Sequence, residues 1–365
     1  MIPFVDLTAQ YQSIKNEIDT AINECIAKTN FIKGEAVSSF EGEFAEYLGA
    51  KYSIGCGNGT DALEIIMKSL GIGTGDEVIV PALTWISTAE AVTNVGAEPV
   101  FVDIDPSTYT IDSTKIEEKL TKRTKAVIPV HLYGYPAEMN EIETIAKKYD
   151  LFIIEDCAQA HGAEYNGKKV GTFGIASAFS FFPSKNLGAY GDGGSIVTND
   201  KNICDLARKI SNHGQLNEKH RHFIIGRNSR LDSIQASILR VKLKYLDEWN
   251  LRRKKAASFY ISRLKDKSEF ILPVCEKGKK HVYHLFVIRC RERKKVIELL
   301  EEKNISWGIH YPKILPLLDP YSYKKHIAGD FAVAESVTDE IISIPIYPEI
   351  GTDQLNVICT QLLKL

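Results

Sequence analysis

One lysine stands in a run that is otherwise aromatic, small or glycine: "SFFPSKNLGAYGDGG", residues 180–194. An amine attacks a carbonyl only in its unprotonated form, and free lysine has a pKa of about 10.4. Poor solvation lowers that pKa, which is how lysines that form Schiff bases are activated. The aromatic side chains of the run provide low polarity around Lys185, and its glycines let backbone approach a ligand closely. The residue types therefore predict that Lys185 reacts with an aldehyde. The alternative is a lysine on a surface turn whose ammonium group reaches water.

A carboxylate at the end of an apolar stretch fits the same chemistry. Asp156 closes the apolar run of "LFIIEDCAQAHG", where its side chain has no value for packing. A carboxylate in this place pairs with a pyridinium nitrogen and keeps it protonated, which turns the ring into an electron sink. Gln159 and His161 follow within a turn or two and are expected to face the same cavity. The alternatives are an aspartate that caps the following helix and a structural histidine.

A glycine-rich segment runs into a helix at "GCGNGTDALEIIMKSLGI", residues 55–72. A helix N-terminus carries free N–H groups and a partial positive charge, so it binds phosphate. Thr60 is placed to donate its hydroxyl to the same phosphate. The segment matches neither the Walker sequence nor the dinucleotide GxGxxG pattern, which favours the phosphate of a smaller ligand. The alternative is a threonine that only caps the helix.

An aromatic residue completes the set. Trp85, in "PALTWISTAEAV", lies at the start of a predicted helix and can stack on a flat heterocycle; a buried core tryptophan is the alternative. Phosphate site, stacking aromatic, pyridinium carboxylate and Schiff-base lysine occur in that order along the chain. Together they are the contacts that a phosphorylated pyridine aldehyde needs, and they predict pyridoxal 5′-phosphate as the cofactor.

The elements around these residues predict an α/β fold. From residue 60 to about 200, short apolar strands alternate with helical patterns. Apolar strands separated by helices predict a mostly parallel sheet that is covered on both faces. Ligands bind beyond the carboxyl ends of such strands, and Thr84, His131, Asp156 and Lys185 all follow predicted strand ends.

The pattern changes towards the C-terminus of the 365-residue chain, which is long enough for two domains. Leu239, Leu243 and Leu246 form one helical stripe, and this helix is expected to leave the large domain. A smaller α+β unit follows. We therefore expect a large domain over residues 1–247, with an N-terminal helix, and a small C-terminal domain over 248–365.

Composition and motifs exclude several classes. The net charge is −2, and the basic clusters lie in helical patterns, so neither nucleic acid nor a membrane surface is an expected partner. No leader pattern and no apolar stretch of about 20 residues is present. The seven scattered cysteines indicate free thiols in a reducing cytoplasm. No closed Cys/His set predicts a metal site, and no GxSxG motif predicts a serine hydrolase.

The sequence resembles the DegT/DnrJ/EryC1/StrS family of pyridoxal-phosphate-dependent nucleotide-sugar aminotransferases. The resemblance runs nearly end to end, through "IPFVDLTAQY", "GNGTDAL", "EDCAQAHGA", "FSFFPSKNLGAYGDGG", "GRNSRLDSIQASIL" and "GIHYP". It implies the type I PLP-dependent aminotransferase fold, with a mostly parallel, helix-covered sheet in the large domain. It also implies a homodimer whose active sites lie at the subunit interface.

The resemblance implies a role for each residue that matches the family's motifs. Lys185 would form the internal aldimine and move the proton. Asp156 would hold the pyridine nitrogen, Gln159 would lie near the phenolic oxygen, and Trp85 would stack on the ring.

The cofactor phosphate would be surrounded by backbone amides and hydroxyls of Gly59, Thr60, Asp61 and Ser180. Asn228 would reach the phosphate of the neighbouring subunit's cofactor. His310 and Tyr311, in "HYP", resemble positions near the sugar nucleotide.

The implied reaction takes nitrogen from L-glutamate, releases 2-oxoglutarate and aminates a keto sugar linked to a nucleoside diphosphate. Such sugars enter surface polysaccharides, O-antigen or lipopolysaccharide among them, or glycosylated natural products. The N-terminal stretch and "PALTWISTAEAV" favour members that act at C3; the base (UDP, dTDP or GDP) and the sugar stay open.

Three alternatives remain. Sugar dehydratases on the same scaffold replace the lysine with histidine, so Lys185 favours transamination. Intact Lys185 and Asp156 disfavour a non-catalytic regulator. The missing GxGxxG pattern disfavours a nicotinamide-dependent sugar epimerase or dehydrogenase.

Overall fold

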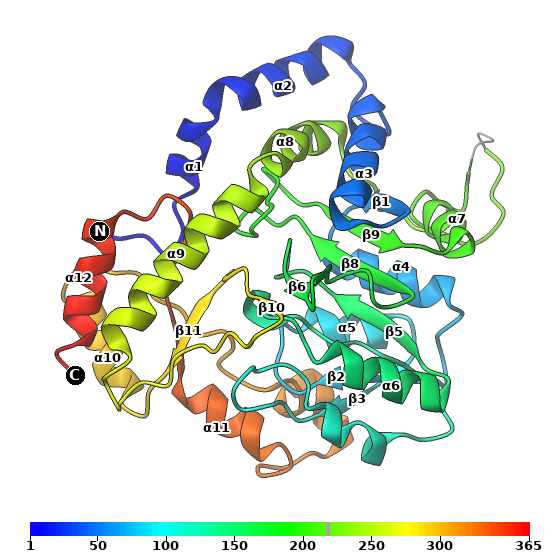
Figure 1. The fold of residues 1–365 in the computed structure, drawn as a ribbon. Coiled ribbons are helices and arrows are strands. Elements are labelled where there is room, and N and C mark those ends of the chain that lie inside the picture. The colour runs from blue at the N-terminus through cyan, green and yellow to red at the C-terminus, as the bar shows by residue number, and fades with distance from the viewer. Residues whose placement is uncertain (217–219) are drawn as a thin grey trace.

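The computed structural model describes residues 1–216 and 220–365, and its centre is a seven-stranded sheet (Figure 1). In spatial order the strands are β1 (Tyr52–Cys56), β9 (Gly194–Thr198), β8 (Ala176–Ser180), β5 (Phe152–Asp156), β4 (Thr124–Val127), β2 (Glu77–Pro81) and β3 (Glu98–Val102). Strands β8, β5, β4, β2 and β3 pair in parallel, whereas β9 is antiparallel to both β8 and β1. The predicted mostly parallel sheet is confirmed.

Helices cover both faces of this sheet because its strands are apolar on both sides. In β2, Val78 and Val80 face a core shared with α4 (Gly59–Ser69), α5 (Ser87–Asn94) and α7 (Lys201–Ile210). Ile79 points the other way, into a cluster with α6 (Met139–Tyr149). Side chains alternate along a strand, so a strand buried on both faces becomes a continuous apolar run.

A layer of helices packs on the β8–β9 side. Phe40 and Phe44 of α3 (Glu35–Leu48) contact Phe179 and Phe181, which lie at the end of β8. Helices α1 (Leu7–Ser13) and α2 (Lys15–Lys28) run outside α8 (Ser233–Leu243), as Figure 1 shows. The leucine stripe predicted for one helix spans two, because α8 ends at Leu243 and α9 (Leu246–Leu264) starts after a short break.

The chain after α9 builds a second core. Strands β11 (Phe286–Arg289) and β12 (Ile341–Ile344) pair antiparallel and pack with α9, α10 (Arg293–Glu301) and α12 (Thr352–Leu362). Residues between these strands, including Ile314, Tyr321 and Phe331, instead join the core of the large sheet. The C-terminal part therefore reaches back to the edge of the sheet where the strands end.

The remaining elements are short. They are β6 (Glu164–Tyr165), β7 (Lys168–Lys169), β10 (Lys279–Lys280), α11 (Ala332–Glu340) and the 3-10 turns Ser113–Lys115, Glu117–Lys119, Leu132–Gly134, Leu315–Leu317 and Asp319–Lys324. Within residues 1–216 and 220–365, none of the helices combines the length and apolar character needed to span a membrane.

Candidate active site

A cavity of about 740 Å³ opens at the carboxyl ends of the parallel strands. It is lined by ten of the predicted site residues: Gly59, Thr60, Asp61, Trp85, Asp156, Gln159, Ser180, Lys185, His310 and Tyr311. Asp156 is the last residue of β5 and Ser180 the last of β8, while Thr60 lies in the first turn of the helix that follows β1. Parallel strands bring their ends to one edge, which is why residues distant in sequence meet here.

Lys185 has the electrostatic character that its sequence context predicts. Burial lowers the pKa of its ammonium group to about 8, although the negative charge of Asp156 acts in the opposite direction. With this pKa about a tenth of the amine is unprotonated at pH 7, far more than for a free lysine, so it is available as a nucleophile and as a base. It lines the cavity rather than a surface turn.

The loop that carries Lys185 is held on both sides. Asn186 is 2% exposed and donates from Nδ2 to Asn250 Oδ1 (2.8 Å) on α9 and to the carbonyl of Val282 (3.0 Å). At Gly188, a Cβ atom would lie 2.3 Å from the carbonyl oxygen of Pro183, so only glycine allows this tight turn. These contacts fix the lysine relative to the cavity.

Asp156 is buried and only partly satisfied by hydrogen bonds. Its Oδ2 accepts from the Thr88 hydroxyl (2.9 Å) and its Oδ1 from the Ala158 amide (3.1 Å). Burial raises the pKa of this carboxyl, while the two hydrogen bonds and the charge of Lys185 oppose that shift. A protonated ring nitrogen beside Asp156 would offset the cost of burying its negative charge.

Gln159 connects the strand end to the C-terminal part of the chain. Its Oε1 accepts from the Tyr133 amide (2.7 Å), and its Nε2 donates to the Tyr311 hydroxyl (3.0 Å). The ring of Tyr311 lies 5.4 Å from that of Trp85, tilted by 44°. Trp85 is 55% exposed, so the alternative of a buried core tryptophan is wrong.

The N-terminus of α4, where the sequence predicts a phosphate site, lines the cavity, and its helix cap differs from the expected one. Asn58, not Thr60, caps the helix: its Oδ1 accepts from the Asp61 amide (2.8 Å). Gly59 and Thr60 are the first two helical residues, whose amides have no partner within the helix. A Cβ at Gly59 would lie 2.9 Å from Cβ of Ser180, so glycine lets the helix approach the end of β8.

His310 enters the cavity from the C-terminal part of the chain. It stacks on Phe4 at 5.6 Å and its Nδ1 hydrogen-bonds with the Ser343 hydroxyl (2.8 Å). Burial, with a smaller effect of the Lys185 charge, lowers the pKa of its imidazole to about 4. His310 is therefore neutral at physiological pH and can recognise ligand groups by hydrogen bonds alone.

Several residues around the cavity lie elsewhere than predicted or were not predicted. His161 does not line the cavity; it is buried beside Phe179, with ring centroids 5.4 Å apart, and burial lowers its pKa to about 3. Asn228 is exposed and also lies outside the cavity of its own chain. Phe4 and His284 line the cavity without having been predicted, because neither stands in a motif with a chemical reading.

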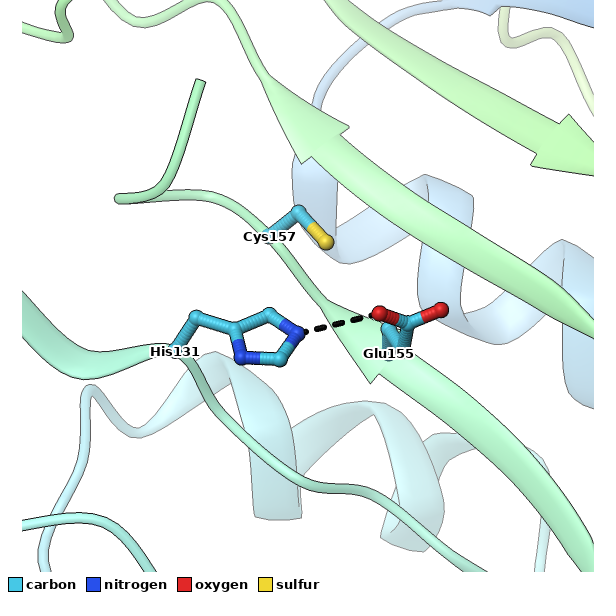
Figure 2. Close-up of side chains that lie close together, drawn as sticks. All are labelled: His131, Glu155 and Cys157. Carbon is cyan, nitrogen blue, oxygen red and sulfur yellow. Dashed lines mark hydrogen bonds and ion pairs between the residues drawn. The ribbon is translucent and has the colours of Figure 1, made fainter. Parts of the chain in front are cut away.

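His131 follows a strand end but faces away from the cavity, into a cluster with Glu155 and Cys157 (Figure 2). Its Nδ1 accepts from the Ala137 amide (3.0 Å), so Nε2 carries the proton and donates to Glu155 (3.1 Å). The Glu155 carboxylate also accepts the backbone N–H groups of residues 171, 173 and 174. Since hydrogen bonds already use the ring nitrogens and the carboxylate, the cluster supports the fold behind Asp156 rather than offering metal ligands.

A mostly parallel sheet with a desolvated lysine, a buried carboxylate and a helix N-terminus around one cavity defines a type I aminotransferase fold built for a pyridine aldehyde phosphate. The chain belongs to the DegT/DnrJ/EryC1/StrS aminotransferase family, whose model matches residues 12–363. It is thus a pyridoxal-phosphate-dependent aminotransferase.

Individual proteins similar to this chain include a transaminase and a protein named as a regulator. The chain is 46% identical to a dTDP-3-amino-3,6-dideoxy-alpha-D-galactopyranose transaminase of Aneurinibacillus thermoaerophilus, over 97% of each chain. It is 44% identical to a pleiotropic regulatory protein of Geobacillus stearothermophilus, over 97% of this chain and 95% of the relative. The crystal structure of S. venezuelae DesV in complex with a ketimine intermediate superposes with a TM-score of 0.97 at 38% identity, covering 100% of this chain and 98% of that one.

Proposed function

We propose that the protein transfers an amino group from L-glutamate to carbon 3 of a keto sugar linked to a nucleoside diphosphate. The observation that carries this proposal is the desolvated Lys185, which shares one cavity with the buried Asp156. Amination at C3 is supported by the name of the Aneurinibacillus relative. The cavity volume of about 740 Å³ lies within the range of small-molecule sites.

The described residues fit the cofactor that the family uses. Bound pyridoxal phosphate would supply an aldehyde carbon that takes up the amino group and a ring that takes up electrons. In our proposal Asp156 holds the ring nitrogen and Gln159 lies near the phenolic oxygen. Trp85 covers one face of the ring. The phosphate is held by the α4 N-terminus and nearby side chains: Gly59, Thr60, Asp61 and Ser180.

Lys185 is proposed to move the proton in both halves of the reaction. An acid–base group works best when its pKa lies near the working pH, and burial lowers the pKa of Lys185 to about 8. Because its loop is fixed through Asn186 and Gly188, the amine stays within the cavity when it is not bonded to the cofactor.

His310 and Tyr311 are proposed to contact the sugar nucleotide. Both line the cavity, and Tyr311 lies between Gln159 and Trp85. A sugar held by these two side chains would occupy the cavity that Lys185 also lines and would displace water from it.

A second subunit is proposed to complete the site, so that the protein works as a cytoplasmic homodimer. Asn228 is exposed on its own chain and is proposed to bind the phosphate of the partner's cofactor. We further propose that each subunit divides near residue 247 into a large and a small domain. The aminated sugar would enter a surface polysaccharide, such as O-antigen, or a glycosylated product.

A substrate panel tests the proposal. UDP-, dTDP- and GDP-linked 3-keto and 4-keto sugars are offered with L-glutamate, and 2-oxoglutarate release is measured. We expect release with 3-keto sugars and much less with 4-keto sugars. Turnover of 4-keto sugars alone would overturn the C3 assignment.

The name of the Geobacillus relative makes a regulatory role the second candidate. Addition of glutamate to the holoenzyme separates the two. A catalyst loses the absorption band of its lysine-bound cofactor, whereas a protein that only senses a ligand keeps it.

A further inference from the structure

The two ends of the segment that carries Asn228 pair with each other. We call residues 211–230 the arm; the structure describes 211–216 and 220–230 of it. An antiparallel bridge joins Asn212 to Asn228, with hydrogen bonds from the His213 amide to the Arg227 carbonyl (2.9 Å) and from the Ser229 amide to the Ser211 carbonyl (3.0 Å). The returning part of the arm is therefore extended.

Residues on either side of Asn228 contact the phosphate helix of their own chain. Arg227 pairs through Nη2 with Asp61 (2.5 Å) and through Nη1 with Glu64, both on α4. The Ser229 hydroxyl accepts from the Gly57 amide (2.9 Å), two residues before α4 begins. In an extended chain, positions i and i+2 share a face and i+1 lies on the opposite one. Asn228 accordingly points away from α4 and is exposed.

Arg227 faces two carboxylates that hold it in place. Asp61 and Glu64 are 9% and 6% exposed, and Glu64 also accepts from Asn94 Nδ2 (2.9 Å) on α5. Buried carboxylates need a paired cation, and a guanidinium bonded to both restricts the side chain more strongly than a single contact does. The arm is thereby anchored to the helix whose N-terminus is the phosphate site of its own subunit.

We propose that Arg227 is a positioning residue that couples the two cofactor sites of the dimer. It fixes the base of the arm on α4 of one subunit, and this presents Asn228 to the cofactor phosphate of the partner subunit. Loss of Arg227 in one subunit therefore weakens cofactor binding in the other. This inference rests on the proposed function, in which Asn228 acts across the interface.

Mixed dimers test the coupling across the interface. A subunit carrying Lys185→Ala and Arg227→Met is combined, through a second affinity tag, with an otherwise wild-type subunit. Only the wild-type subunit links pyridoxal phosphate to a lysine, and the neighbouring arm is the altered one. Cofactor occupancy is read as pyridoxyl-lysine fluorescence after borohydride reduction, over a range of pyridoxal phosphate concentrations. We expect the apparent Kd to rise about tenfold relative to a dimer whose partner carries Lys185→Ala alone, the size of one lost hydrogen bond to a charged group.

Companion dimers separate the possible failures. A dimer with Asn228→Ala in place of Arg227→Met shows the full effect of losing the contact with the partner's cofactor. Arg240→Met is the control, because Arg240 is about as exposed as Arg227 and also pairs with a carboxylate, Glu43. If Asn228→Ala raises the Kd of the partner site and Arg227→Met does not, Arg227 is not a positioning residue, and the shared site still stands. If Asn228→Ala leaves this Kd unchanged, the proposal that the two subunits share a cofactor site is wrong.

A second, more conservative variant tests the proposal in case Arg227→Met prevents folding. Glu64→Gln keeps Arg227 but removes the negative charge of one of its two partners, and we expect a smaller rise in the Kd of the partner site. An unchanged Kd for both Glu64→Gln and Arg227→Met, in dimers that unfold at the wild-type temperature, contradicts the proposal.

Discussion

Two lysines of this protein have lowered pKa values but differ in their access to a ligand. Burial lowers the pKa of Lys185 to about 8 and that of Lys242, on α8, to about 7. The Lys242 Nζ donates to the carbonyl of Gly188 (2.7 Å) and lies 4.3 Å from the ring centroid of Tyr190, with no exposed surface. Lys185 instead lines a large cavity. A lowered pKa therefore does not by itself identify a nucleophile; access to a ligand does.

The same contrast recurs in two adjacent carboxylates of β5. Glu155 is fully buried among backbone N–H groups and His131, so its hydrogen bonds are complete. Asp156, the next residue, points to the cavity with fewer partners. The protein itself uses the hydrogen-bond acceptors of Glu155, whereas those of Asp156 remain available to a ligand.

Removing Lys185 gives the largest expected effect. Lys185→Ala loses both the nucleophile and the proton carrier, so kcat for 2-oxoglutarate release should fall by about a thousandfold or more. Lys242→Met is the matched control and should keep kcat within about tenfold, since its amine contacts only protein. Normal turnover by Lys185→Ala, or equal losses in the two variants, would remove the distinction between the lysines.

Removing the charge of Asp156 comes next. Asp156→Asn cannot hold a ring nitrogen in its protonated form, so kcat/KM should fall by about a hundredfold, in the range of a lost acid–base contribution. Glu155→Gln should act mainly on stability, lowering Tm by several degrees because buried backbone donors lose a charged acceptor. A larger kinetic loss in Glu155→Gln than in Asp156→Asn would contradict the assignment of the two carboxylates.

The pH dependence of cofactor attachment gives a smaller effect. Only the unprotonated amine attacks the aldehyde, and the pKa of Lys185 in the protein without cofactor is lowered to about 8. The rate of attachment should therefore rise about tenfold per pH unit below 8 and level off above it. Stopped-flow mixing of apoprotein with pyridoxal phosphate measures this rate. A midpoint near the pKa of free lysine would show that Lys185 is well solvated.

Lys242 gives the smallest expected effect, on stability. Its pKa is about 7 in the folded protein and about 10.4 when unfolded, so between these values the unfolded chain binds the extra proton. Wild-type stability therefore rises with pH across this window, and Lys242→Met should lack that rise. Calorimetry measures the Tm of both proteins at pH 6.5 and pH 9. The Tm of the wild type minus that of Lys242→Met should be larger at pH 9 than at pH 6.5. A difference independent of pH would argue against a neutral buried Lys242.

The sequence predicts the sheet and the meeting of its strand ends because both follow from local pattern. Apolar runs identify the strands, and parallel topology brings Asp156, Ser180 and Lys185 to one edge. Details that depend on tertiary partners were not predictable. Thr60 and Asn58 both suit a helix cap, and only the backbone path selects Asn58.

Side-chain direction was equally out of reach. His131 and Asp156 both lie near the carboxyl ends of strands, yet His131 turns to Glu155, away from the cavity. The exposure of Trp85 depends on which segments cover it, and residues from the far end of the chain, such as Tyr311, do so only partly. Residue type and spacing indicate which chemistry is possible, and packing decides which side chains take part.

The most direct test is to identify the lysine that carries the cofactor. The holoenzyme is reduced with borohydride, digested and analysed by peptide mass spectrometry. We expect the pyridoxyl group on Lys185 alone, with Lys242 unmodified. A label on Lys242 or on any other residue, or no label at all, would contradict the account.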